Sequence, residues 1–97
     1  MVYTVIVHAW TLPGKEAEMK KLLIEASQIF LKDKGTIDWF VMQDAQDPTA
    51  WSIVERYEAE SDLKAHHENP YFQKFPEVFG PLLDSDKPFQ IFSHNEL

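Results

Sequence analysis

The sequence predicts an α+β fold, a ferredoxin-like βαββαβ antiparallel sheet with its helices on one face. Four short segments rich in β-branched and aromatic residues alternate with two segments of helical hydrophobic spacing, in the order strand, helix, strand, strand, helix, strand. No linker, repeat or low-complexity tract interrupts that order. The first strand is apolar on both sides, which indicates that both of its faces are covered.

The chain of 97 residues is short enough to form a single domain that spans residues 1–97. Its hydrophobic content of 44% is sufficient for a globular core. A net charge of −7 repels phosphate backbones and anionic lipid, so we predict neither a nucleic-acid partner nor a membrane partner. The lack of cysteine excludes disulfides, thiol nucleophiles and thiolate metal sites.

The N-terminal segment MVYTVIVHAW has no basic region followed by a long apolar run and a cleavage site, so no secretion signal is predicted. No segment approaches the roughly 20 apolar residues that cross a bilayer. We therefore expect a soluble, cytoplasmic protein.

The first predicted strand, residues 2–10, is followed by a Pro-Gly turn and a helix over residues 15–35. Alternation in the strand places Ile6, His8 and Trp10 on one side and the remaining apolar residues on the other, namely Tyr3, Val5, Val7 and Ala9. The helix is predicted to have Lys32 and Lys34 in its last turn and to end at Gly35.

Two further strands are predicted over residues 36–44 and 51–58, with a turn at Asp47-Pro48 between them. Alternation in the second of these strands predicts that Glu55 shares a covered face with Trp51, Ile53 and Tyr57. Arg56 points the other way, and we expect it to be solvated or at the rim of a dimer.

The C-terminal half is predicted to contain two short helices and a last strand over residues 87–94. Ser61 is the predicted N-cap of the first helix, which continues to about Glu68. Asn69 is the predicted cap of the second helix, with Pro70 at its first position. Pro76 is predicted to kink or split that second helix.

One face of the predicted sheet has no helices to cover it, although the first strand is apolar there too. A second copy of the chain, packed sheet against sheet, covers such a face most simply. We therefore predict a homodimer.

Three segments carry a resemblance to a known family: TLPGKEAEM, KGTIDWFVMQDAQDPTAWSIVERYE and DLKAHHENPYFQKF. In this order and spacing, over residues 3–94, they resemble the antibiotic biosynthesis monooxygenase family. The resemblance implies a dimeric α+β barrel with its helices outside. It also implies oxidation of aromatic polyketides or quinols by O₂ without metal, flavin or haem. Haem-degrading relatives use an Asn, Trp and His set that this sequence does not reproduce, since His8 or Trp10 stands near the position of the Asn.

The resemblance places His66 at the family's histidine position, and Tyr71 replaces a second histidine that is frequent after the proline. Helical spacing alone does not choose between His66 and His67, which diverge by about 100° around a helix. We predict that His66 faces a pocket as the catalytic base and that His67 lies at the surface. A histidine that packs under the helix or caps a carbonyl is the alternative.

Glu55 is predicted to orient His66 or to act as the base itself, while a structural salt bridge is the alternative. Tyr57 and Trp39 are predicted to position the substrate. The predicted substrate-binding residues are mostly aromatic, and each could instead fill the core or cap a helix: Trp10, Trp39, Trp51, Asn69, Tyr71, Phe72, Phe75 and Phe79.

No metal or cofactor site is predicted. His8 and His94 fall at opposite ends of the sheet if their strands pair antiparallel, and no His-x-x-x-His motif is present. The chain has three glycines and no Gly-rich phosphate loop, so a nucleotide or flavin has no visible cradle.

The resemblance implies a cofactor-independent monooxygenase of secondary metabolism, and the candidate base and aromatic residues are compatible with that activity. Its expected substrates are O₂ and a small aromatic or lipophilic molecule such as a phenol, anthrone or quinol. Two alternatives remain. One is a lyase or isomerase that uses the same base without O₂. The other is a non-catalytic dimer that binds a small ligand or whose cavity is filled by its own aromatic side chains.

Overall fold

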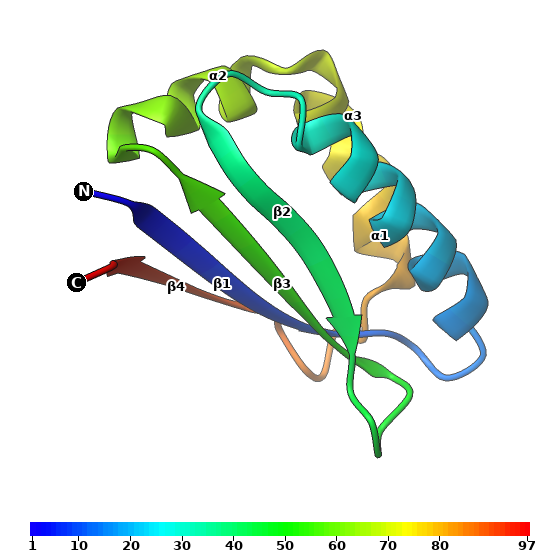
Figure 1. Ribbon diagram of the computed structural model, residues 1–97. Helices are drawn as coiled ribbons and strands as arrows, with labels where there is room; N and C mark the ends of the chain where they lie inside the picture. The colour runs from blue at the N-terminus through cyan, green and yellow to red at the C-terminus, as the bar shows by residue number, and fades with distance from the viewer.

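The computed structural model, which describes residues 1–97, has one antiparallel sheet with all its helices on the same face (Figure 1). The strand order is β2-β3-β1-β4. This arrangement confirms the predicted α+β, ferredoxin-like fold. The elements are β1 (Tyr3–Trp10), α1 (Glu16–Phe30), β2 (Thr36–Gln43), β3 (Ala50–Tyr57), α2 (Leu63–Glu68), α3 (Pro70–Phe79) and β4 (Gln90–Asn95), with 3₁₀ turns at Glu60–Asp62 and Gly80–Leu82.

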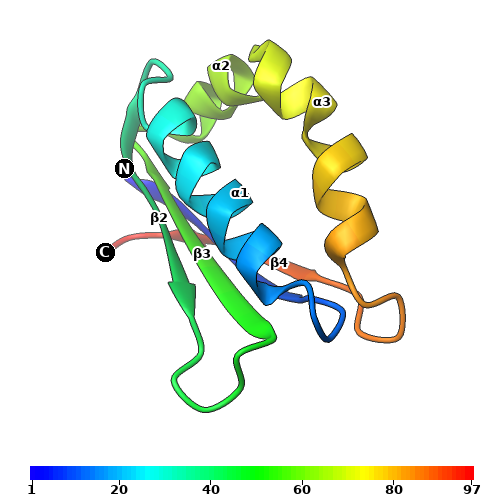
Figure 2. The same ribbon diagram turned by 90° about the vertical axis from the view of Figure 1, so that its right-hand side faces the viewer.

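The helix α1 covers β2 and β3, and α3 lies beside α1 on the side of β4 (Figure 2). The buried residues of α1 recur at helical spacing and pack onto the sheet: they are Met19, Leu23, Ala26 and Phe30. From the sheet, the alternate residues of β1 and β3 complete the core: Val5, Val7, Ala9, Trp51, Ile53 and Tyr57. The core therefore lies between one sheet face and the helices.

A β-bulge near the start of β2 decides which face Trp39 occupies. Thr36 pairs with Tyr57, but Asp38 pairs with Arg56, so one extra residue stands on the β2 side. Because side chains alternate between faces, the extra residue shifts the rest of β2 by one face. Trp39 consequently lies opposite Glu55, under the helices.

The end of α1 differs from the prediction. The helix stops at Phe30 and leaves Lys32 and Lys34 outside its last turn. The chain then reverses through a turn in which Asp33 N–H donates to the Phe30 carbonyl and Thr36 N–H to the Asp33 carbonyl. Gly35 belongs to this turn, with φ of +82°, rather than to a helix cap.

The predicted caps of the C-terminal helices were right for Asn69 and wrong for Ser61. Asn69 Oδ1 accepts the Tyr71 N–H at 2.9 Å. Ser61 instead lies inside the 3₁₀ turn, where the Asp62 carboxylate accepts the Ala59 N–H at 3.0 Å. Asp62 therefore holds the start of the 3₁₀ turn that leads into α2.

Pro76 does not split α3, which continues from Pro70 to Phe79. Pro76 lacks the backbone N–H that would bond to the carbonyl four residues earlier. The helix nevertheless continues past it, and the Gly80 N–H bonds to the Pro76 carbonyl one turn later.

The last strand begins at Gln90 rather than at residue 87, and it continues to Asn95. No helix of the structure is long and apolar enough to cross a bilayer.

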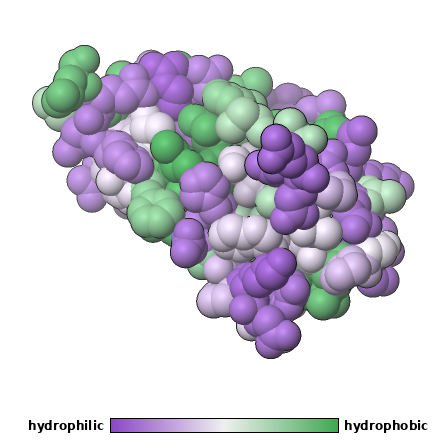
Figure 3. Space-filling view, turned by 90° about the horizontal axis from the view of Figure 1, so that it is seen from below, coloured by the Kyte–Doolittle hydropathy of each residue, from purple (hydrophilic) through white to green (hydrophobic).

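The sheet face opposite the helices carries an apolar row across all four strands. Strand register aligns the row, which consists of Phe40, Val54, Ile6 and Phe92. Phe40 and Phe92 are 43% and 47% exposed. Seen from below, the molecule displays a group of apolar side chains bordered by polar ones (Figure 3).

Arg56 lies on this same face, with a side chain that is 32% exposed, so it is partly solvated as predicted. Its guanidinium forms ion pairs with Asp38 at 2.8 Å and with Glu96 at 2.7 Å. Glu96 also accepts from the Thr4 hydroxyl. These contacts hold the C-terminus against the sheet.

Candidate active site

A cavity of about 260 Å³ lies between the sheet and the helices. Ten of its fourteen lining residues are hydrophobic, so it favours an apolar guest. Val7, Ile53 and Ile91 form its floor on the sheet, and α3 covers it with Phe72, Phe75 and Phe79. The remaining lining residues are Phe30, Trp39, Glu55, His66, Pro76, Gly80, Leu83 and Phe89. The predicted hollow is present, and the aromatic side chains do not fill it.

His66 projects from α2 into the wall of this cavity and is 4% exposed. Its ring packs edge-on against Phe30, with ring centroids 4.4 Å apart. Nδ1 of His66 lies 3.3 Å from Oδ2 of Asp33. Asp33 is itself held by Asn69, whose Nδ2 donates to Oδ1 at 2.8 Å. The turn after α1 and the end of α2 therefore fix the imidazole from behind.

Glu55 stands on the other side of the imidazole. Its Oε1 is 3.6 Å from Nε2 of His66 and accepts a hydrogen bond from the Tyr57 hydroxyl at 2.6 Å. Both carboxyl and hydroxyl come from β3, two residues apart and thus on the same sheet face. Trp39 lies opposite Glu55, and its indole Nε1, which makes no hydrogen bond of ordinary length, helps to stabilise the Glu55 carboxylate.

Burial shifts the pKa values of Glu55 and His66 in opposite directions. It raises the pKa of the Glu55 carboxyl, although the Tyr57 hydroxyl opposes the shift by stabilising the carboxylate. It lowers the pKa of His66, and Asp33 opposes this shift by stabilising the imidazolium. The imidazole is therefore neutral at pH 7.

The tautomer of neutral His66 follows from its neighbours. An ionised carboxylate can only accept, so we assign the proton to Nδ1, which donates to Asp33. Nε2 is then an unprotonated acceptor that faces Glu55 at 3.6 Å. If Glu55 is ionised as well, these two acceptors have no proton between them, and the pair is arranged to take one from a guest in the cavity.

Tyr57 does not contact the cavity, contrary to its predicted role in positioning the substrate. It is fully buried beneath the site and is absent from the cavity wall. Burial and the neighbouring Glu55 charge raise the pKa of its hydroxyl, which therefore stays protonated. Tyr57 can act only through its hydrogen bond to Glu55.

Four of the predicted substrate-binding residues also lie outside the cavity. Trp10 is on the opposite sheet face, because alternation in β1 separates it from Val7. Trp51 is buried with its Nε1 3.5 Å from the Thr11 hydroxyl. Tyr71 packs against α1, where its ring contacts that of Phe30 and its hydroxyl donates to Glu25 at 3.2 Å, and Asn69 caps the helix. Trp39, Phe72, Phe75 and Phe79 do line the cavity.

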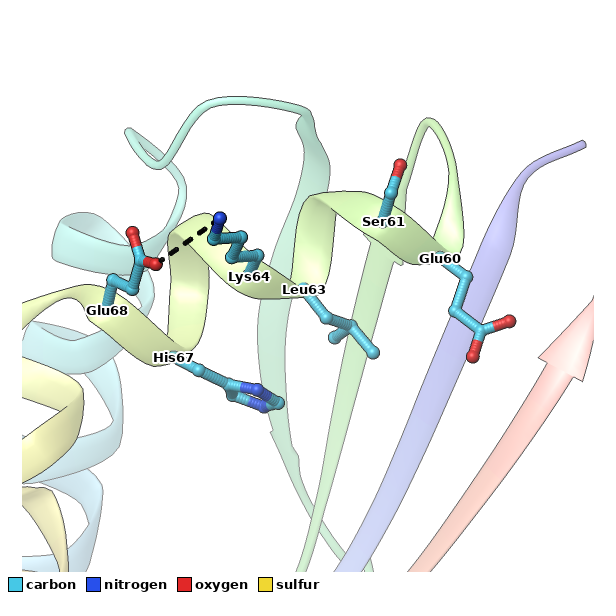
Figure 4. Close-up of a pocket in the computed structure, with 6 residues that line it drawn as sticks. All are labelled: Glu60, Ser61, Leu63, Lys64, His67 and Glu68. Carbon is cyan, nitrogen blue, oxygen red and sulfur yellow. Dashed lines mark ion pairs between the residues drawn. The ribbon is translucent and has the colours of Figure 1, made fainter.

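A second, larger depression of about 740 Å³ lies along α2 and the 3₁₀ turn before it (Figure 4). Figure 4 shows Lys64 turned toward Glu68, with which it pairs at 3.9 Å, while Leu63 and His67 point to the other side of the helix. Five of its six lining residues are polar or charged. This open surface lacks the buried acid–base pair, so the candidate site is the apolar cavity.

Asp33 is the site residue that the sequence did not reveal. It was predicted to lie within a helix, and the segment LKDKG gives no local signal of a contact with α2. The contact depends on the early end of α1, which places Asp33 in a turn.

No group of three or more histidine, aspartate or glutamate residues is arranged to hold a metal ion.

Solved structures resemble the chain over almost its whole length. A candidate antibiotic biosynthesis monooxygenase from Nitrosomonas europaea has a TM-score of 0.89 and 21% identity, over 98% of both chains. PA3566 from Pseudomonas aeruginosa has a TM-score of 0.88 and 19% identity, over 99% of this chain and 94% of that one. Rv0793 from Mycobacterium tuberculosis has a TM-score of 0.87 and 20% identity, over 100% of this chain and 96% of that one. At these identities the likeness establishes the fold.

A comparison with curated proteins found no match. The sequence model of the family described as antibiotic biosynthesis monooxygenase matches residues 2–78. The matched residues contain α1, β3 and α2, which supply Asp33, Glu55 and His66 or lead directly into them. The chain therefore belongs to the antibiotic biosynthesis monooxygenase family.

Proposed function

We propose that the protein is a monooxygenase that removes a proton from a small aromatic or lipophilic substrate and lets the resulting anion react with O₂. One observation carries the proposal. Nε2 of His66 faces Glu55 at 3.6 Å on the wall of an otherwise apolar cavity, and the contact of Nδ1 with Asp33 assigns the ring proton to Nδ1 and leaves Nε2 free to accept one. A base in a dry pocket is what this chemistry requires of the protein. Membership of the family supports the same reaction class.

His66 takes the role of base in this reaction. The substrate proton goes to Nε2, and the imidazolium so formed lies between two carboxyl groups, Asp33 at 3.3 Å and Glu55 at 3.6 Å. Their negative charge stabilises it in surroundings that otherwise disfavour a cation. Glu55 is the alternative base, because burial raises its pKa toward neutrality.

The chemistry balances without a further reductant when the substrate carries a CH₂ group activated by a ring and a carbonyl, as in an anthrone. The carbanion gives its electron pair to O₂ and forms a C–O bond. The resulting hydroperoxide loses water, by cleavage of its O–O bond and loss of the second C–H proton, and leaves a carbonyl. The sum is R₂CH₂ + O₂ → R₂C=O + H₂O. The proposal therefore requires no cofactor.

An oxygen electrode tests this proposal with anthrone and with polycyclic phenols. Wild type should consume O₂, and His66→Ala should reduce turnover by about 10²–10⁴, the usual contribution of a general base. Lys64→Ala is the matched control, because Lys64 is on the same helix as His66, has a side chain that is 81% exposed and does not line the cavity. Circular dichroism should show that all three proteins are folded.

Two results would contradict the proposal. Undiminished O₂ consumption in His66→Ala removes His66 from the reaction. Conversion of the substrate under strict exclusion of O₂ indicates the lyase or isomerase alternative, and binding without turnover indicates a ligand-binding protein.

We also propose that the protein is a homodimer joined through the sheet face opposite the helices. The apolar row across all four strands, with Phe40 and Phe92 about half exposed at its two ends, supports a partner of the same shape and chemistry. The cytoplasmic location and the role in secondary metabolism remain predictions.

A further inference from the structure

A second chamber adjoins the cavity on the far side of His66. It also has a volume of about 260 Å³. The two chambers share five lining residues, namely Val7, Glu55, His66, Phe72 and Ile91. Because His66 and Glu55 belong to both, the chambers meet at the acid–base pair.

The two chambers differ in polarity. Apart from His66 and Glu55, the first is lined by apolar side chains and a glycine, whereas the second adds the polar groups of His67 and Ser93. Ser93 pairs with Val5, which places both side chains on the face under the helices. His67 points with Leu63 to the inner side of α2 (Figure 4), and its ring lies 4.8 Å from that of Phe72.

The polar groups of the second chamber are reached by solvent and are open to hydrogen bonds with a guest. Neither the imidazole of His67 nor the hydroxyl of Ser93 hydrogen-bonds to another group of the chain, and both can donate and accept. A carboxylate guest is disfavoured there, because Glu55 lines the chamber and the protein carries a net charge of −7. An uncharged oxygen substituent, a hydroxyl or a carbonyl, fits this chemistry.

We propose that the substrate is amphipathic and spans both chambers, with an apolar ring system in the first and an uncharged oxygen substituent in the second. His67 and Ser93 then determine specificity by hydrogen-bonding that oxygen. The reacting atom lies between the two ends, beside His66 and Glu55. This inference rests on the proposed function in that it takes the cavity as the substrate site.

Anaerobic binding tests the inference without turnover, by titration of tryptophan fluorescence with 1-naphthol and with 1,6-dihydroxynaphthalene. Wild type should bind the dihydroxy compound more tightly, by about 2- to 12-fold for each added hydrogen bond. In the variant that combines His67→Phe with Ser93→Ala this preference should vanish, while the affinity for 1-naphthol stays within about twofold of wild type. Phenylalanine keeps a ring against Phe72, so packing is retained.

Glu68→Gln is the matched control, because Glu68 is on the same helix but on the side away from the second chamber. It should retain the full preference. Retention of the preference in the double variant overturns the inference, and so does a wild type that binds both compounds equally or binds neither. A wild type that prefers the dihydroxy compound but consumes no O₂ contradicts only the proposed function. Oxidation that depends on His66 without any preference contradicts only the inference.

Discussion

At the scale of single residues, the site consists of one imidazole between two carboxyl groups. Asp33 fixes the tautomer and the ring of His66 from Nδ1, and Glu55 faces Nε2 where a substrate proton would arrive. Tyr57 in turn holds Glu55 from below. Asp33 is thus a positioning residue, and its effect on the reaction is transmitted through His66.

Asp33→Asn tests this role through the pH profile of O₂ consumption. Burial holds the pKa of His66 below 6.5, so wild-type activity should fall only as the pH drops below 6.5 and the base becomes protonated. Asp33 opposes that lowering, so its neutralisation should lower the pKa of His66 further and move the acid limb to lower pH.

The maximal rate of Asp33→Asn should also fall, by about 10-fold or more, because a neutral amide holds the Nδ1–H less firmly than a carboxylate does. The measurement is kcat/KM against pH in constant ionic strength. A purely structural role predicts a lower rate with an unmoved acid limb, and that result would contradict the assignment of Asp33.

At the scale of elements, the turn after α1 and the start of α2 are in direct contact. Gly35 has φ of +82°, and a Cβ placed there would come within 2.2 Å of the Asp62 Cγ. Asp62 holds the Ala59 N–H at the beginning of the segment that carries His66. The absence of a side chain at Gly35 therefore lets α2 approach the turn that contains Asp33.

Gly14 and Gly35 both have a positive φ, but only Gly35 lies against Asp62. Comparing an alanine substitution at each position therefore separates the effect of the Asp62 contact from the effect of backbone strain. Gly14→Ala should destabilise the protein by about 1–2 kcal/mol, because a side chain disfavours the left-handed region and nothing lies within 4 Å of the new Cβ. Gly35→Ala should cost at least about 1 kcal/mol more, since it also displaces Asp62.

Urea unfolding measures both free energies. If Gly35→Ala is no more destabilising than Gly14→Ala, α2 is not held against the turn as described. Displacement of α2 should also lower the rate of O₂ consumption in Gly35→Ala. The rate should be unchanged in Gly14→Ala, because Gly14 lies in the turn between β1 and α1, away from the cavity.

At the scale of the whole molecule, the two faces of the sheet have separate roles. One face bears the core and the cavity, and the other carries an exposed apolar row with the ion pairs of Arg56 beside it. Burial of a large apolar side chain contributes about 1.5–3 kcal/mol. Two copies of this face, packed together, would bury several such side chains.

The dimer is tested by sedimentation of wild type and of Phe40→Asp. Wild type should have twice the mass of the 11.3 kDa chain. Phe40→Asp should raise the dissociation constant at least about 10-fold, because it exchanges an apolar contact for a charge that loses its hydration.

Val78→Asp is the matched control for this experiment. Val78 is 52% exposed and lies on α3, on the opposite side of the sheet from Phe40. The same change of charge there should leave the mass unaltered. A monomeric wild type, or equal masses for all three proteins, would contradict the proposed interface.

Much of the fold could be predicted because its signals are local. Alternation in residues 51–57 placed Glu55 with Trp51, Ile53 and Tyr57 on a covered face, and the Asn-Pro pair at residues 69–70 marked a helix start. The end of α1 could not be predicted in this way. Lys32, Lys34 and Gly35 resemble a helix terminus, but the chain turns earlier to bring β2 beneath the helix.

The site was predicted only in part, for the same reason. Neighbouring histidines on a helix differ by about 100° in direction, so at most one of them could point well inward, and the sequence could not show which groups would contact it there. Aromatic residues such as Trp10 and Tyr71 look equally suited to a cavity wall, and only the packing of α3 on the sheet separates them from Phe72 and Phe75.

Local signals in the sequence are enough to predict the succession of strands and helices, the covered face of β3 and an imidazole on the helix above it, because periodicity and capping act within a few residues. The position of His66 between Asp33 and Glu55, where two chambers meet, follows from packing between elements and is seen only in the folded chain. Those contacts join residues that are 33 and 11 positions apart, and their distances depend on how α2 packs against the turn and the sheet.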